Sequence, residues 1–173
     1  MKKRTYKTKK VNQINWDLLK SRLAGEEVAL AIDIAKKKQF ALLFNKSNDV
    51  SELFRWSHPE ETPAVLEAIN SLSCPVVVIV ESTSTYGDAI RFQFSQLGFD
   101  IHQASAKRVH DAKEVYDGVP SLHDAKSATI IGRFYQDKLT TPWRELTEAE
   151  RRLNALRREF DMHQGQYQRN KGR

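Results

Sequence analysis

A single cysteine, Cys74, is present among the 173 residues, so the chain cannot form an internal disulfide, which fits a reducing compartment. Long apolar runs are also missing, because none approaches the roughly 20 residues that a membrane-spanning helix needs. The basic N-terminus is not followed by the apolar segment of a secretory signal. We therefore expect a cytoplasmic protein with no membrane partner.

Acidic residues are scarce at the two ends of the chain. Residues 1–24 hold one Asp against eight Lys and Arg, and residues 144–173 hold five acids against eight. The segment 25–143 has the opposite balance, with sixteen acids and twelve basic residues. This pattern suits a metal-dependent enzyme that acts on a polyanion, because carboxylates collect cations while Lys and Arg hold phosphates. Solvated tails are the other interpretation, and both stay open for residues 1–12, which we expect to be disordered.

The order of the apolar segments predicts an α/β fold. Helical spacing of apolar residues and β-branched runs mark the elements. The sequence predicts helices over 14–25, 59–73, 87–97, 106–115 and 122–138, and strands over 27–35, 38–46, 50–58, 75–83 and 99–104. Three strands joined by short turns, followed by alternating helices and strands, are the order of an RNase H-like (RuvC-like) fold, a mixed sheet with flanking helices.

The turn after the first predicted strand contains no glycine. Ribose-kinase and actin-like folds also begin with an Asp on the first strand of a meander, and they supply a glycine-rich turn for the phosphates of ATP. Here the turn after the first strand reads AKKKQ. The sequence therefore disfavours an ATP-binding fold of that kind.

Apolar residues recur every seven positions near the C-terminus. The two series are Leu146, Leu153, Phe160 and Tyr167, and Ala149, Leu156, His163 and Asn170. Taken as a and d positions, they give about three heptads of a coiled coil. We expect a partner helix to cover this seam, and packing against the chain's own domain is the alternative.

Two acids interrupt apolar strands, and they carry the chemistry. Asp33 lies within VALAIDIA, and Glu81 ends VVVIVE. A carboxylate in a buried strand costs several kcal/mol unless a cation or a set of donors compensates it. One such Asp would ordinarily be a structural hydrogen-bonding residue, whereas two at the ends of strands in one sheet favour a shared metal site.

Three segments of the chain together resemble a known family. They are AIDIAKKKQFALL, VESTSTYGDAI and AKEVYDGVPSLHDAKSATIIGRF. In this order and spacing they resemble the N-terminal RuvC-like domain of DEDD-type insertion-sequence transposases, relatives of Piv-like invertases, some of which are guided by a bridge RNA. The resemblance covers residues 27–140 and extends into RELTEAERRLNALRREF, which is similar to the coiled coil that follows this domain in the family.

The resemblance implies a two-metal site for DNA strand cleavage. Asp33, Glu81 and Asp124 correspond to the first three acids of the DEDD set. Two Mg²⁺ (or Mn²⁺) ions roughly 4 Å apart would activate the nucleophile and stabilise the leaving oxygen. The family ends its site with D-x-x-D, and this chain has Ser127 at the fourth position. In the other possible register Asp124 is the fourth acid and Ser121 stands at the third, so one carboxylate is missing either way.

The resemblance also implies the domain organisation. We expect a basic N-terminal arm with a short helix over 1–24, an RNase H-like nuclease domain over 25–142 and a heptad-bearing helix over 143–173. Family members continue into a C-terminal domain with a serine nucleophile, and we expect this chain to be truncated before it.

Two functions follow from the resemblance. The first is metal-dependent DNA cleavage by the N-terminal domain of a prokaryotic transposase, and the alternative is a catalytically degenerate, nucleic-acid-binding remnant. The expected partners are DNA, a structured guide RNA and further copies of the chain held through the C-terminal helix. A RuvC-like junction resolvase is disfavoured by the heptad helix and the E-S-T-x-x-Y step. Basic residues expected to contact phosphates are Lys2, Lys3, Arg4, Lys36, Lys37, Lys38, Lys107 and Arg108.

Overall fold

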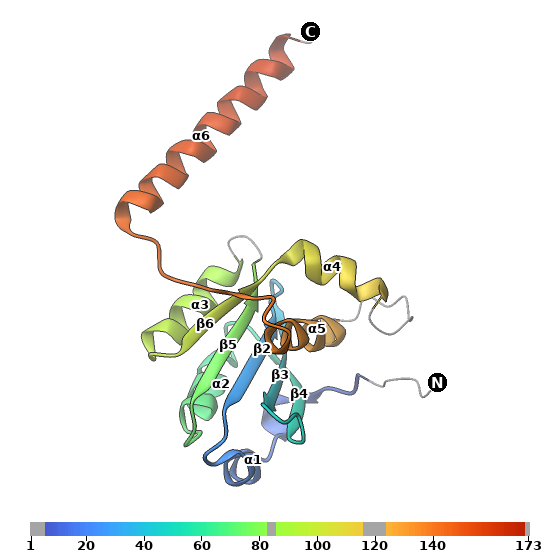
Figure 1. Cartoon of the computed structure of the whole chain (residues 1–173). Coiled ribbons are helices and arrows are strands. Elements are labelled where there is room, and N and C mark those ends of the chain that lie inside the picture. The colour runs from blue at the N-terminus through green and yellow to red at the C-terminus, as the bar shows by residue number, and fades with distance from the viewer. Residues whose placement is uncertain (1–5, 83–85, 116–123, 172–173) are drawn as a thin grey trace. The chain divides into compact units, whose positions relative to one another are not determined.

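The computed structural model describes residues 6–82, 86–115 and 124–171 (Figure 1). The elements in chain order are β1 (Lys9–Lys10), η1 (Val11–Gln13), α1 (Trp16–Leu23), β2 (Val28–Asp33), β3 (Lys38–Asn45), β4 (Ser51–Ser57), α2 (Thr62–Asn70), β5 (Val76–Glu81), α3 (Tyr86–Gln96), β6 (Asp100–Ala104), α4 (Ala106–Val115), α5 (Asp124–Gln136), β7 (Thr141–Pro142) and α6 (Glu148–Lys171). The chain divides into two compact units, Met1–Trp143 and Arg144–Arg173.

The first unit is built on one mixed sheet. Within the described residues its strand order is β1-β4-β3-β2-β5-β6-β7. Strands β2, β3 and β4 form an antiparallel meander, and β2 pairs in parallel with β5, which pairs in parallel with β6. This arrangement confirms the RNase H-like sheet with flanking helices that the order of the segments predicts.

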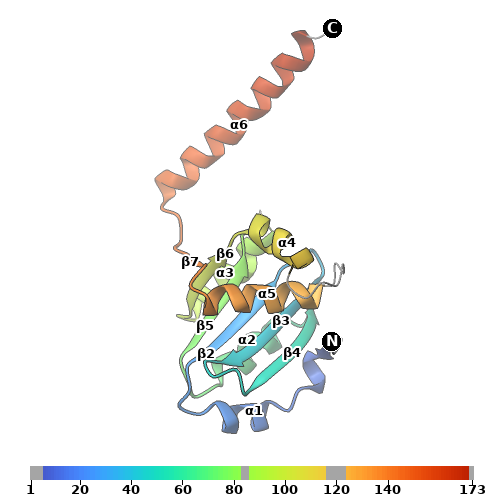
Figure 2. The ribbon, with the colours of Figure 1, turned by 45° about the vertical axis from the view of Figure 1, so that its right-hand side comes forward.

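Helices cover both faces of the sheet (Figure 2). One face packs with residues of α1, α2 and α3, such as Leu23, Ile69 and Phe94, in the larger apolar cluster. The other face packs with Val109 of α4 and Ile130 of α5 in a smaller cluster. Because β2 lies between the two clusters, all six of its residues are buried, which explains its lack of polar alternation.

Local sequence signals set the ends of α1. The side chain of Asn15 accepts a hydrogen bond from the backbone N–H of Leu18 at 3.0 Å and caps the start of the helix. After the last turn Gly25 adopts a φ of 80°, a left-handed conformation that glycine takes without steric cost. The chain thereby turns directly into β2.

The expectation that residues 1–12 are disordered is wrong for the segment from Lys9 onward. Lys9 and Lys10 pair in parallel with β4, opposite Phe54 and Arg55. Val11 follows in a 3₁₀ turn and is 5% exposed in the larger apolar cluster. The basic composition concealed this short edge strand, because a lysine on an edge strand keeps its charge in water while its backbone pairs.

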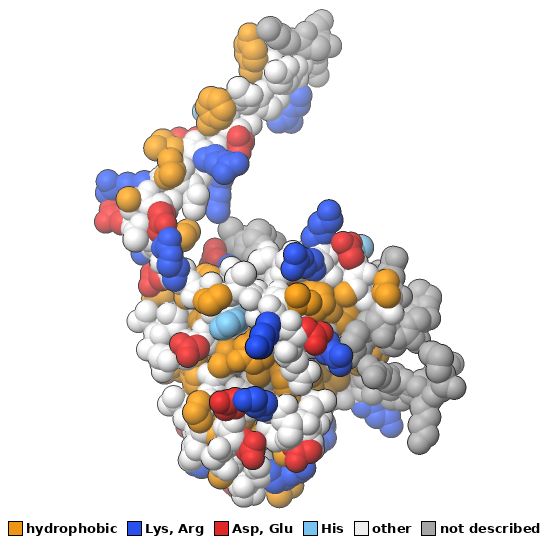
Figure 3. Space-filling model, viewed as in Figure 1, with side chains coloured by type: hydrophobic (Ala, Val, Ile, Leu, Met, Phe, Trp, Pro, Cys, Tyr) orange, Lys and Arg blue, Asp and Glu red, His pale blue; other side chains and the backbone are white. Residues whose placement is uncertain are grey.

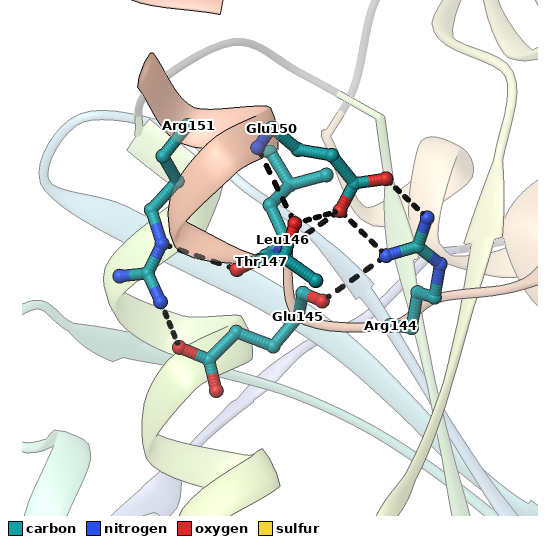
Figure 4. Close-up of polar contacts among 6 residues, drawn as sticks. All are labelled: Arg144, Glu145, Leu146, Thr147, Glu150 and Arg151. Atoms are coloured by element: carbon teal, nitrogen blue, oxygen red, sulfur yellow. Dashed lines mark hydrogen bonds and ion pairs between the residues drawn. The ribbon is translucent and has the colours of Figure 1, made fainter. Parts of the chain in front are cut away.

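The second unit consists mainly of α6, which begins at a capping box (Figure 4). The backbone N–H of Thr147 donates to the Glu150 carboxylate at 2.9 Å, and the Thr147 hydroxyl accepts from the Glu150 N–H at 3.3 Å. Hydrogen bonds from Arg144 and Thr147 lower the pKa of Glu150 to about 2. Leu153, Leu156 and Phe160 of the predicted seam are each more than 60% exposed, and a partner helix for them stays a prediction.

A helix of 24 residues such as α6 is long enough to span a bilayer, but it is rich in charge. Among the described residues, none of the helices combines the length and apolarity that crossing a membrane requires.

Helix α5 approaches strand β3 closely at Gly132. A Cβ atom added there would lie 3.0 Å from the Phe44 ring and 3.4 Å from a methyl group of Leu42. Both neighbours belong to the smaller apolar cluster. Glycine at position 132 thus lets α5 pack directly on the sheet, with its first residue at the end where β2 finishes.

We expect Gly132→Val to lower the free energy of unfolding by about 1–3 kcal/mol, because the added methyl groups overlap Phe44. Urea denaturation of the variant and the parent chain measures the change. Gln136→Val is the matched control, because it places the same side chain on an exposed position of the same helix. Equal stability of the two variants would contradict the close packing of α5 on β3.

Candidate functional site

Two acids lie side by side where the central parallel strands end. Asp33 is the last residue of β2, and Glu81 is the last residue of β5. The register of the parallel pair matches Ile32 with Val80, so the two acids are the next neighbours across the strands. Both alternate with residues of the larger cluster, so both belong to the sheet face that α4 and α5 cover.

The environment of Asp33 favours its neutral form. Its side chain is buried, and the residue is 7% exposed. Burial raises its pKa from 3.8 to about 7, reinforced by a hydrogen bond with the Glu81 carboxyl group and by the negative charge of Glu81. The negative charge of Asp124 adds a smaller increase in the same direction. Asp33 therefore keeps its proton up to near neutral pH.

A cation faces this pair of carboxyls. The positive charge of Lys113 on α4 lowers the pKa of Asp33 and opposes the other effects. Sequence reasoning gave Lys113 no role, although a signal was available. Lys113 follows the buried Val109 by four residues, so it shares the helix face that packs toward the sheet.

Asp124 and Ser127 lie on the first turn of α5. Asp124 is exposed and acts on Asp33 through its charge. Ser127 is fully buried, and its hydroxyl oxygen has no hydrogen-bond partner within the described part of the chain. Two residues three positions apart share a helix face, as the D-x-x-D spacing requires. The preceding residues, including Ser121, lie outside the described residues.

The donor set fits a divalent cation in part. Paired carboxylates are ligands that Mg²⁺ and Mn²⁺ prefer, and a cation would relieve the repulsion between Asp33 and Glu81. Over residues 6–82, 86–115 and 124–171, however, no three His, Cys, Asp or Glu side chains converge closely enough to hold a metal ion. Asp124 affects the pKa of Asp33 only through its charge, whereas Glu81 also forms a hydrogen bond with Asp33. This weaker effect agrees with the finding that no third carboxylate of the described residues converges on the pair. The pair is in place, and the third carboxylate is nearby.

Basic residues lie around the same end of the sheet. Lys36 and Lys37 form the exposed turn between β2 and β3, and Lys38 begins β3. Lys107 and Arg108 are exposed on the first turn of α4, which follows the end of β6. Because β6 runs parallel to β2 and β5, that turn is at the same edge as Asp33. The predicted contacts Lys2, Lys3 and Arg4 lie outside the described residues.

A buried cation that sequence reasoning missed lies on α3. Arg91 is 5% exposed and pairs with Asp88, and its Nε and Nη1 atoms have no partner within the described residues. A Cβ added at Gly87 would lie 3.2 Å from Nη1 and 3.3 Å from Ile34, the residue after Asp33. Gly87 therefore makes room for the guanidinium beside the end of β2.

A separate hollow lies at the other end of the central strands, where β2 and β5 begin. Its volume is about 660 Å³, and it is lined mainly by apolar atoms of residues such as Val28, Val77 and Tyr135. A hollowed, mostly apolar area is visible on the face drawn in Figure 3. The Lys46–Glu27 ion pair at its rim is exposed. The lining of this hollow does not include Asp33 or Glu81.

No family model matches this chain, and no curated protein matches it significantly. Among solved structures, the chain is similar to RuvC of Thermus thermophilus in complex with a Holliday junction substrate, with a TM-score of 0.41, 14% identity, and coverage of 67% of this chain and 99% of that one. A second Thermus thermophilus RuvC structure gives a TM-score of 0.40 and 12% identity with the same coverage. Values this low carry no argument about function, and the RNase H-like assignment rests on the strand order.

The raised pKa of Asp33 predicts that the protein loses stability as pH rises. Between the unperturbed value of 3.8 and the folded value of about 7, the folded state binds more protons than the unfolded state. The free energy of unfolding therefore falls across this window, by up to about 4 kcal/mol. We expect Asp33→Asn, in buffer with a chelator, to be more stable than the parent chain at about pH 8 and to show a flatter pH profile.

Urea denaturation at several pH values checks this expectation. Asp137→Asn is the control, because it neutralises an exposed aspartate just after the far end of α5, whose surface ion pair with Arg133 contributes little to stability. Parallel profiles for Asp33→Asn and the parent chain would refute the raised pKa of Asp33.

Proposed function

We propose that this chain is a metal-dependent nuclease domain that acts on DNA. The observation that carries the proposal is the pair of neighbouring carboxyls, Asp33 and Glu81, at the carboxyl ends of two central parallel strands. A pKa of about 7 for a buried Asp is unfavourable for folding at neutral pH, and perturbed acids of this kind cluster at functional sites. A divalent cation held by Asp33 and Glu81 would offset this cost.

Asp33 and Glu81 would hold the cation, with Asp124 as the nearest further carboxylate. Bound Mg²⁺ or Mn²⁺ supplies an activated water nucleophile and stabilises the leaving oxygen in phosphodiester hydrolysis. Asp33 has to release its proton before it can bind a cation, so the affinity for metal depends on pH. Lys113 brings a positive charge to the same place, where it favours the ionised form of Asp33 in the free protein.

The finer assignment, to the N-terminal domain of a DEDD-type insertion-sequence transposase, is supported by the three matching segments around Asp33, Glu81 and Asp124. This assignment implies a prokaryotic cytoplasmic location, DNA as the substrate, use of a structured guide RNA and assembly through α6. Exposure of the seam residues of α6, such as Leu153, supports the last of these.

A degenerate, nucleic-acid-binding remnant is the second candidate function. Ser127 favours it, because a buried hydroxyl stands where the family has its fourth carboxylate and brings no charge to offset a dication. The two candidates share the DNA-binding surface and differ in cleavage. A nicked or branched DNA substrate incubated with Mn²⁺ separates them, because the remnant binds this DNA without cutting it.

We expect the parent chain to bind Mn²⁺ with an affinity that rises between about pH 6 and pH 8, as Asp33 loses its proton. Calorimetric titration with Mn²⁺ measures the affinity, and repeating it in buffers of different ionisation enthalpy measures the proton released. Asp33→Ala should abolish binding and any DNA cleavage, while Asp137→Asn should leave both unchanged. Cleavage that survives Asp33→Ala would eliminate the proposed active site.

We expect Ser127→Asp to destabilise the metal-free protein by several kcal/mol, because position 127 is fully buried. Mn²⁺ should recover much of that stability and raise the rate of DNA cleavage above that of the parent chain, because the restored carboxylate completes the metal site. Thermal unfolding with and without Mn²⁺ measures the recovery. Ser127→Asn is the control, because asparagine has nearly the same shape as aspartate but carries no charge. An equal response of both variants to Mn²⁺ would show that position 127 is not part of the site.

A further inference from the structure

One face of the sheet carries a continuous row of side chains that starts at the paired acids. Strand register matches Asp33 with Phe40, Phe40 with Arg55, and Arg55 with Lys10. Directly opposed residues on neighbouring strands point to the same face. The neighbours of Arg55 in the chain, Phe54 and Trp56, belong to the larger cluster on the other face, so Arg55 points to the face of α4 and α5.

The basic end of this row is exposed and is fixed by the fold. Lys10, Lys38 and Arg55 are exposed and line one hollow of about 230 Å³. The backbone N–H of Lys10 donates to the Gln13 side chain at 3.0 Å, and the next residue, Val11, is buried in the core. Lys10 is therefore held on the edge strand, beside β4.

In the part of the chain that the structure describes, the basic side chains around this hollow are not engaged in ion pairs. Lys9, which belongs to the opposite face, pairs with Glu52 at 2.8 Å. Within the described residues, Lys10, Lys38 and Arg55 make no ion pair, and the one acid lining their hollow, Glu61, accepts a hydrogen bond from the Ser57 N–H. Like charges directly opposite on neighbouring strands destabilise a sheet, so the Lys10–Arg55 pair is unfavourable until an anion joins it.

We propose that the row from Asp33 to Lys10 is the track along which one strand of the DNA substrate lies, with its phosphates on Arg55 and Lys10. This rests on the proposed function. Three strand spacings separate Asp33 from Lys10, roughly 14 Å, which equals the rise of about four nucleotides along the axis of a DNA duplex at ~3.4 Å each. The strand thus leaves the acidic pair over Phe40 and runs toward the edge of the sheet at β1, on the opposite side of the acids from β5 and β6.

Salt-dependent DNA binding tests the track. The probe is a short fluorescein-labelled single strand of DNA, and fluorescence anisotropy gives the affinity at several salt concentrations, with a chelator present. Each lost phosphate contact should reduce the slope of log affinity against log salt by about 0.7, so the double variant Lys10→Gln/Arg55→Gln should lose about 1.4. Lys20→Gln/Arg22→Gln is the matched control, because both residues are exposed on α1 at the opposite end of the sheet (Figure 1).

The free protein provides a second readout. Without DNA, Arg55→Gln should be as stable as the parent chain or slightly more stable at low salt, because it removes the repulsion with Lys10. The track is overturned if the salt slope of the double variant equals that of the parent chain, or if the control variant loses as much slope as the double variant. Either result leaves Mn²⁺ binding at Asp33 intact. Absence of DNA binding by the parent chain at low salt would instead overturn the proposed function together with the track.

Discussion

The parallel pairing of β2 with β5 is the contact on which the rest of the structure depends. It joins the antiparallel meander to the helix-and-strand half of the domain, and it buries β2 between the two apolar clusters. Parallel strands end at the same edge of a sheet, so the same pairing sets Asp33 beside Glu81. Stability and chemistry therefore share one origin, because the register that buries Ile32 and Val80 also brings the two carboxyls together.

Burial gives the acidic pair its properties. An exposed Asp would ionise with an ordinary pKa, whereas Asp33 retains a proton to about pH 7, because burial and its neighbour Glu81 both oppose its charge. The positive charge of Lys113 offsets part of this effect, because it favours the ionised form of Asp33. Arg91 is a buried cation near the same edge, with two nitrogens that lack partners within the described residues. Under the proposed function, a cation would complement the acids and a phosphate would complement the basic groups.

The sheet brings together charged side chains that are far apart in the sequence. In the sequence, Lys10, Lys38 and Arg55 belong to three separate segments, and only Lys38 was expected to contact phosphate. The fold places all three around one hollow, and strand pairing puts Arg55 and Lys10 in the row that leads from Asp33 to the sheet edge. Helix α6 forms a unit of its own, and its exposed apolar residues, including Leu156 and Phe160, form the seam for which the sequence predicts a partner helix.

The sequence alone determined the order of the elements and the two acids, because apolar periodicity and a carboxylate inside a buried strand are local signals. It also gave Asp124 and the substitution at Ser127, by resemblance to a family motif. The tertiary structure decided the rest. Lys113, the row that ends at Lys10 and the short strand β1 depend on which strands and helices become neighbours. Such neighbours are far apart in the chain, so composition near Lys9 predicted disorder where long-range pairing with β4 imposes order.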